Sequence, residues 1–210
     1  ENHLEAKLGE RFIRGVAVEE IPDAPNILIT TPANVAAELL ESAAPELSGA
    51  LREVQYTPIV SVTAFAAQSS FQTPVKGVGV LVPAKERRQC LGILFNSSSF
   101  ENRVKDESLY ASFTVLLGGS AQPQWVSASD EEIKTAVRDE LQELLGMKGE
   151  PLQFVINRWP RAIPKYSVGL PEVWETARAT WCSEPGRLLF GNYTGQVSLR
   201  GIIETAAALG

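Results

Sequence analysis

Residues 191–210 read GNYTGQVSLRGIIETAAALG and follow the short apolar run Leu188–Phe190, which predicts a strand. Glycines at 191 and 195 bracket a turn, and Ser198 is placed to cap a helix whose apolar residues predict a core-facing stripe: Ile202, Ile203, Ala206 and Leu209. A strand, a glycine turn and a helix start together present unpaired N–H groups, which can receive a negatively polarised oxygen. An ordinary strand–turn–helix with a packed glycine explains the spacing alone, and it is the commoner case for so short a motif.

The region from Thr57 to Leu117 alternates apolar runs with short polar spacers. Four runs predict strands, and Leu152–Asn157 predicts another; the four are 59–65, 77–82, 90–95 and 112–117. Short connections favour antiparallel neighbours. Glycines at 79 and 92 within these strands indicate either close approach of another group to the sheet or simple tight packing. The sequence predicts an α+β fold, a mostly antiparallel sheet covered by helices.

The clearest helix is Ser129–Gly146, because Ser129 and Glu132 have capping-box spacing and Gly146 is a helix stop. Its acidic residues predict a solvated face rather than a carboxylate site: Glu131, Asp139, Glu140 and Glu143. Elsewhere, strands are predicted at Arg11–Ile21 and Ile27–Thr30. The remaining predictions are Thr31 as a helix cap and helices at 3–8, 33–40, 45–51 and 171–181.

The stretch Trp159–Tyr166 carries a second functional signal. Its two prolines predict a fixed crossing loop, and it is rich in aromatic and basic residues. Aromatic side chains can wall a flat ring system, and cations can meet propionates or phosphates. The simpler alternative is a rigid loop with ordinary surface charges.

Composition excludes several classes of function. The chain has 210 residues, of which 44% are hydrophobic and 21% charged, and its net charge of −6 argues against a nucleic-acid partner. His3 is the only histidine, which disfavours a Ser-His-Asp triad or a histidine-based metal site. The two cysteines at 90 and 182 lack CxxC spacing and fit reduced thiols. No signal peptide is visible, so we expect a cytoplasmic protein. Membrane association through a part of the protein missing from this chain is also open.

Two motifs, RWxxAIPxYxVG at 158–169 and GNYxGxVSLxGxIExA at 191–206, closely resemble the protoporphyrinogen oxidase family within the flavin-containing amine oxidase superfamily. The resemblance covers almost the whole chain. It implies dehydrogenation of protoporphyrinogen IX to protoporphyrin IX in heme biosynthesis, with FAD performing the redox chemistry, so that no catalytic side chain or metal is expected. It also implies FAD contacts at six residues: Val18, Trp159, Asn192, Val197, Ser198 and Leu199. It places Leu81, Leu94 and Leu116 in the porphyrinogen pocket, although each leucine could equally be core.

One departure from the family is the absence of a GxGxxG segment, which binds the FAD pyrophosphate. The resemblance therefore implies the C-terminal part of a longer flavoenzyme. Residues 1–33 and 185–210 are predicted to form an incomplete FAD-binding subdomain, and residues 34–184 part of the substrate domain. The expected partner is the N-terminal half of the same polypeptide. Without that half we expect the chain to lack FAD, to be inactive, and to self-associate through an exposed docking face.

Three alternatives remain at this point. The chain could belong to a coproporphyrinogen-oxidising relative, or to another flavoprotein of the amine oxidase superfamily. It could also be a non-catalytic module that has lost the dinucleotide-binding half.

Overall fold

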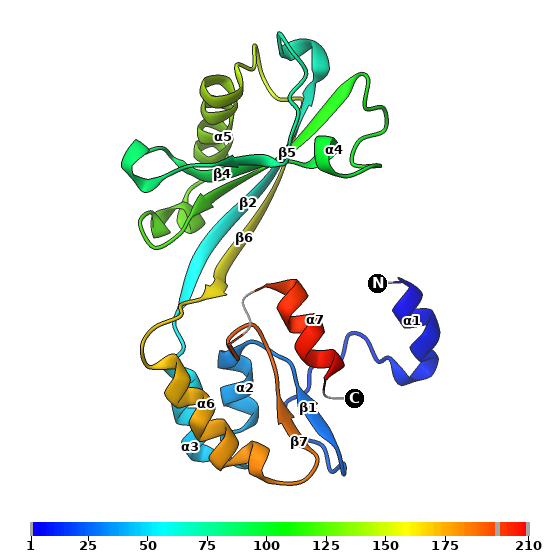
Figure 1. Ribbon diagram of the computed structural model, residues 1–210, viewed down its shortest axis with the longest axis vertical. Coiled ribbons are helices and arrows are strands. Elements are labelled where there is room, and N and C mark those ends of the chain that lie inside the picture. Colours follow the sequence, from blue (N-terminus) through cyan, green and yellow to red (C-terminus); the bar gives the residue numbers. More distant parts are fainter. Residues whose placement is uncertain (1, 196–197, 209–210) are drawn as a thin grey trace. The chain divides into compact units, whose positions relative to one another are not determined.

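The computed structural model describes residues 2–195 and 198–208 (Figure 1). The chain divides into two compact units, one of residues 56–165 and one that combines residues 1–55 with 166–210. These boundaries differ from the predicted ones at 33/34 and 184/185, because the helices at 33–52 and 170–179 cluster with the smaller unit. Which unit serves the cofactor and which the substrate stays a prediction.

The unit of residues 56–165 contains a five-stranded antiparallel sheet in the order β3-β4-β5-β2-β6. This confirms the predicted α+β class and the mostly antiparallel sheet. The long strands β2, β5 and β6 lie next to one another (Figure 1). The strands are β2 (Tyr56–Ala67), β3 (Gly79–Leu81), β4 (Cys90–Phe95), β5 (Tyr110–Gly118) and β6 (Gln153–Pro164). The short helix α4 (Asn96–Ser99) follows β4, and 3-10 turns lie at 68–70, 84–86 and 123–127.

Helix α5 (Asp130–Leu145) covers one face of this sheet and closes its core. The predicted capping box is present: Ser129 Oγ accepts from Glu132 N at 3.3 Å, and Glu132 Oε2 accepts from Ser129 N at 2.8 Å. Gly146 ends the helix at φ 67°, a left-handed conformation that favours glycine. The buried side chains joining helix and sheet include Val60, Val62, Ile93, Phe113, Val115, Ile133, Val137 and Leu141.

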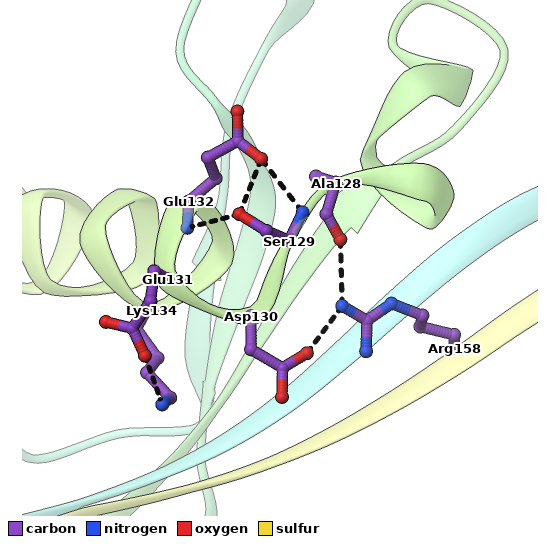
Figure 2. A network of polar contacts seen from close by, with 7 residues as sticks. All are labelled: Ala128, Ser129, Asp130, Glu131, Glu132, Lys134 and Arg158. Atoms are coloured by element: carbon purple, nitrogen blue, oxygen red, sulfur yellow. Dashed lines mark hydrogen bonds and ion pairs between the residues drawn. The ribbon is translucent and has the colours of Figure 1, made fainter.

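Arg158 ties strand β6 to the start of α5 (Figure 2). Its guanidinium donates to the Ala128 carbonyl at 2.8 Å and pairs with the Asp130 carboxylate at 2.6 Å. Arg158, which directly precedes the Trp159–Tyr166 stretch, is thus occupied within the fold.

The predicted crossing loop at Trp159–Tyr166 is wrong, because β6 continues as a strand to Pro164. β6 is an edge strand, and proline, which lacks an N–H group, is tolerated on the unpaired side of such a strand. The pairing jumps from Thr57↔Ile163 to Ile59↔Trp159, so a bulge accommodates Pro160.

Glu140 is also misassigned by the sequence, since its side chain is buried rather than part of a solvated face. Its carboxylate accepts from Arg88 Nε at 2.7 Å and from Gln89 N at 2.8 Å. Arg88 in turn donates to the exposed carboxylate of Glu143 at 2.6 Å. Hydrogen bonds to these two carboxylates raise the pKa of Arg88 above its ordinary value, so the guanidinium stays charged.

The Cys90 thiol lies against the same carboxylate, 3.5 Å from Glu140 Oε2. Burial, reinforced by the Glu140 charge, raises the pKa of Cys90 from 9.0 to about 12. Because the thiolate is the reactive form, we expect Cys90 in a Cys182→Ser chain to react with a disulfide reagent about a thousandfold more slowly than a free thiol at pH 8. The rate of thiol release measures this, and urea should restore fast reaction. Fast reaction of the folded chain would contradict the assignment.

The other unit contains a two-stranded parallel sheet of β1 (Ile27–Ile29) and β7 (Arg187–Leu189), which is separate from the five-stranded sheet, as predicted for these two segments. Its helices are α1 (Asn2–Leu8), α2 (Ala33–Leu39), α3 (Pro45–Arg52), α6 (Leu170–Ala179) and α7 (Leu199–Ala207). Turns of 3-10 helix lie at 9–11 and 181–183. Among the described residues, no helix is long and apolar enough to span a membrane.

Three predictions for this unit are wrong. Arg11–Ile21 is not a strand beyond the 3-10 turn, because no described strand pairs with it, and four of its apolar side chains are exposed: Phe12, Ile13, Val16 and Val18. Thr31 does not cap α2, since Pro32 holds the N-cap position without a side-chain bond. Of the predicted α7 stripe, Ile203 and Ala206 are exposed, Ile202 is half-buried, and Leu209 lies outside the described residues.

Candidate functional site

A hollow of about 360 Å³ lies where β1 and β7 end. The two strands are parallel, with Ile29 opposite Leu189, so their carboxyl ends share one edge of the sheet. Ligands of open parallel sheets bind at this edge. The residues that line the hollow are Thr30, Thr31, Pro32, Phe190, Gly191, Asn192 and Ile202. The predicted cofactor residue Asn192 therefore lies at the sheet edge where a ligand is expected.

The turn after β7 is held from beneath by Tyr193, whose side chain is only 2% exposed. Its hydroxyl donates to the Thr31 carbonyl at 3.1 Å. A Cβ at Gly191 would lie 2.7 Å from the Tyr193 ring, so glycine is required there for tight packing. Tyr166 donates a hydrogen bond to the Asn192 carbonyl and fixes the turn from a second side. The packed-glycine interpretation is thus correct, and Asn192, the residue after that glycine, is among the residues that line the hollow.

Helix α7 begins after this turn with the predicted cap. Ser198 Oγ accepts from Gly201 N at 3.0 Å. Leu199 is 73% exposed, and the first N–H groups of any helix have no partner inside the helix. The predicted residue Val197 lies outside the described residues. Ser198 and Leu199 do not line the hollow, but they start the helix whose Ile202 does.

Val18, predicted to contact the adenine end of the cofactor, is not brought to this site. It lies exposed in the irregular stretch before β1 and does not line the hollow.

The second predicted region is the face of the five-stranded sheet opposite α5. The register sets Leu81 beside Gly92, Gly92 beside Leu116, and Leu116 beside Ser61 in one row across four strands. Leu94 is two residues from Gly92 and therefore points to the same face. The three predicted pocket leucines thus share one face, and Leu81 is 88% exposed in this chain.

Trp159 belongs to that same face. Trp159 pairs with Ile59, which lies two residues from Ser61 in β2. Paired residues, and residues two apart in a strand, point to the same face of a sheet, so the Trp159 side chain points away from α5. Its indole is 55% exposed. A predicted flavin contact and the predicted substrate leucines therefore lie on one open surface, which we call the leucine face and define as Leu81, Leu94, Leu116 and Trp159.

The need for glycine at positions 79 and 92 on this surface is explained by the neighbouring strand backbone. A Cβ on Gly79 would lie 2.4 Å from the Ile93 carbonyl oxygen, and one on Gly92 would lie 2.6 Å from that of Val80. Tight strand packing, one of the two interpretations of the sequence, is therefore sufficient. Gly92 also keeps the space between Leu81 and Leu116 free of a side chain.

The residues around the strand-end hollow fit part of a flavin. Its lining combines apolar surface from Phe190 and Ile202 with polar groups from Thr30 and Asn192. The Thr31 hydroxyl oxygen is buried and has no hydrogen-bond partner in the described part of the chain. A buried hydroxyl without a partner is costly, and a ligand atom reaching it would remove that cost.

Comparison with known proteins covers both of these regions. A sequence model of the flavin-containing amine oxidoreductase family matches residues 14–210. The chain belongs to this family. Family membership confirms the resemblance seen in the sequence motifs and implies a flavin cofactor.

Several relatives of the chain are protoporphyrinogen oxidases. Protoporphyrinogen oxidase 2 of Arabidopsis thaliana is 35% identical over 154 residues, which are 71% of this chain and 30% of that protein. Protoporphyrinogen oxidase 1 of the same plant is 29% identical over 86% of this chain and 35% of its own length. The chain thus spans about a third of the length of these relatives.

Solved structures show the same fold. A candidate protoporphyrinogen oxidase from Exiguobacterium sp. 255-15 superimposes with a TM-score of 0.67 at 23% identity, covering 89% of this chain and 40% of that one. Cyclohexylamine oxidase from Brevibacterium oxydans IH-35A gives a TM-score of 0.60 at 18% identity, over 89% and 42%. The amine oxidoreductase fold therefore extends over both units.

Sequence reasoning did not name Thr30, Thr31 and Ile202 as candidate ligand-binding residues, although they line the strand-end hollow. A signal was present, because Thr-Thr-Pro directly follows a short apolar strand. What the sequence did not show is that β1 runs parallel to β7, some 160 residues later, which sets both strand ends at one edge.

Proposed function

We propose that the chain is the C-terminal part of an FAD-dependent protoporphyrinogen oxidase, which oxidises protoporphyrinogen IX to protoporphyrin IX in heme biosynthesis. The observation that carries this proposal is the leucine face. Three leucines and a tryptophan form an open apolar surface on a sheet of a flavin amine oxidoreductase, and a porphyrinogen is a large apolar macrocycle.

Each region then has its own task. The hollow at the ends of β1 and β7 would hold part of the FAD through Asn192, Thr30 and Thr31. The α7 start, whose Ser198 and Leu199 lie outside the lining of the hollow, would supply helix N–H groups to another part of the cofactor. The leucine face binds and orients the substrate. When bound, FAD would supply the redox chemistry of the oxidation.

The proposal also names a partner. Exposed apolar side chains of the smaller unit, including Ile13, Val16, Val18, Leu28 and Ile203, are the surface we assign to an N-terminal dinucleotide-binding half. A two-stranded parallel sheet is itself unusual, because parallel sheets are normally extended and covered on both faces. We propose a cytoplasmic location, and self-association through this surface when the other half is absent.

The substrate role can be tested by Leu81→Glu in the complete protein. A carboxylate on the exposed leucine face places a desolvated charge against an apolar substrate, so kcat/KM for protoporphyrinogen IX should fall about a hundredfold. Appearance of protoporphyrin fluorescence measures the rate, and coproporphyrinogen III is the competing substrate.

Leu109→Glu is the matched control, since Leu109 is also exposed but precedes β5 and lies off the leucine face. It should retain activity, and both variants should keep their flavin. Equal rates for the Leu81 variant and the parent would show that this face does not bind the substrate. A higher kcat/KM for coproporphyrinogen III would identify the other porphyrinogen as the substrate.

A further inference from the structure

A second hollow, of about 540 Å³, is formed by one end of the five-stranded sheet. Three adjacent strands make its floor: Tyr110 from β5, Phe65 from β2 and Gln153 from β6. Phe65 pairs with both Ser112 and Gln153, and Tyr110 is two residues from Ser112, so all three side chains point to one face. Two aromatic rings and an amide therefore lie together on a rigid base, and Leu152 adds apolar surface.

The wall of this hollow is the loop between α4 and β5, which contributes Asn102, Arg103, Val104 and Lys105. The base of the loop is anchored by Gln68, whose side-chain amide donates to the Glu107 carbonyl at 3.1 Å and whose N–H donates to the Leu109 carbonyl at 2.8 Å. Asp106 accepts from Ser108 N at 2.9 Å and from Ser108 Oγ at 2.6 Å. These contacts hold the base of the loop, at residues 106–109, against the end of β2.

The charge of the hollow is one-sided. Two cations, Arg103 and Lys105, line it, and none of its lining residues is a carboxylate. Within residues 2–195 and 198–208 neither cation forms an ion pair; the Arg103 guanidinium instead lies 5.2 Å from the centre of the Phe100 ring. The lining therefore offers two cations to an anion at contact range, while the carboxylates of the same loop, Glu101, Asp106 and Glu107, lie outside the lining.

We propose that this hollow binds a planar aromatic carboxylate. The Phe65 and Tyr110 rings offer flat apolar surface to an aromatic body, while the Arg103 fork and the Lys105 ammonium reach a carboxylate. Its volume falls within the range of small-molecule sites. The site stands on contacts within residues 56–165 and is independent of the flavin assignment.

The test uses 2-naphthoate as the probe, titrated calorimetrically into the whole chain of residues 1–210. We expect saturable binding of one probe per chain. Uncharged 2-naphthamide tests the carboxylate, and octanoate tests whether an aliphatic carboxylate is accepted instead. Each should bind about tenfold more weakly, the effect of one lost charge-assisted or stacking contact.

The variant Arg103→Gln/Lys105→Gln should weaken naphthoate binding about tenfold or more. Its matched control is Lys85→Gln/Arg87→Gln, which removes the same charge at the same spacing from an exposed turn of the same unit that does not line the hollow. All four residues are exposed, so both proteins should remain folded. The proposal is overturned by an absence of saturable binding to the parent chain, by equal affinity for naphthamide or octanoate, or by equal loss in the control.

Discussion

Replacing Glu140 with glutamine is expected to lower the free energy of unfolding by about 3 kcal/mol. The Glu140 side chain is only 1% exposed, yet it is fully partnered by Arg88, the Gln89 N–H and the Cys90 thiol. The change takes the buried charged acceptor from Arg88 and from the Gln89 N–H, and it leaves Arg88 with only its exposed partner Glu143. Through Arg88, this carboxylate also fastens the start of β4 to the middle of α5.

The matched control is Glu143→Gln, one helical turn away. Glu143 pairs with the same Arg88, but its side chain is 65% exposed. Water solvates an exposed guanidinium–carboxylate pair, so this variant should lose less than about 1 kcal/mol. Urea denaturation gives both values. If the two variants unfold at the same urea concentration, burial of Glu140 does not contribute to stability in the way the structure indicates.

Elements with local signals could be predicted from the sequence. The boundaries of α5 follow from Ser129, Glu132 and Gly146, which act within a few residues of themselves. The strand at Cys90–Phe95 has the predicted bounds, because an apolar run between polar turns is enough to place both ends of a strand. The same locality explains why the cap at Ser198 was found.

Elements that depend on distant partners could not be predicted. Arg11–Ile21 has strand-like composition, but a strand requires a neighbour, and the described sheets offer it none. Glu140 lies in an acidic helix, and its burial depends on the ion pair with Arg88, which is 52 residues earlier in the sequence. Pro160 looks like a strand breaker until the edge position of β6 and its bulge are known.

The candidate site shows both cases. A resemblance in motifs identified Leu81, Leu94, Leu116 and Trp159 one by one, and strand register then brought them to one face. Register is a tertiary property, so their shared surface could not be read from spacing. Asn192 lies at a strand end as expected for a ligand-binding position, whereas the predicted role of Val18 finds no support in its exposed, irregular segment. The roles of all these residues stay predictions.

Ser198→Pro in the complete protein is expected to reduce bound flavin about tenfold or more and to slow porphyrinogen oxidation. Ser198 is the N-cap of α7, and the proposed function aims the N–H groups at this helix start toward the flavin. Proline deletes the N–H of this residue and restricts the backbone of the residue before it. Loss of one hydrogen bond to a charged or strongly polar oxygen accounts for a tenfold change.

Ser198→Ala separates this effect from loss of the cap. Both variants remove the hydroxyl that accepts from Gly201 N, but alanine keeps the backbone N–H. The alanine variant should therefore lose about 1 kcal/mol of stability and retain nearly normal flavin content and turnover. Flavin absorbance per protein and the rate of protoporphyrin formation measure the outcome. The proline variant removes both the cap and the N–H group of residue 198. If it keeps full flavin and full turnover, the α7 start does not contact the cofactor.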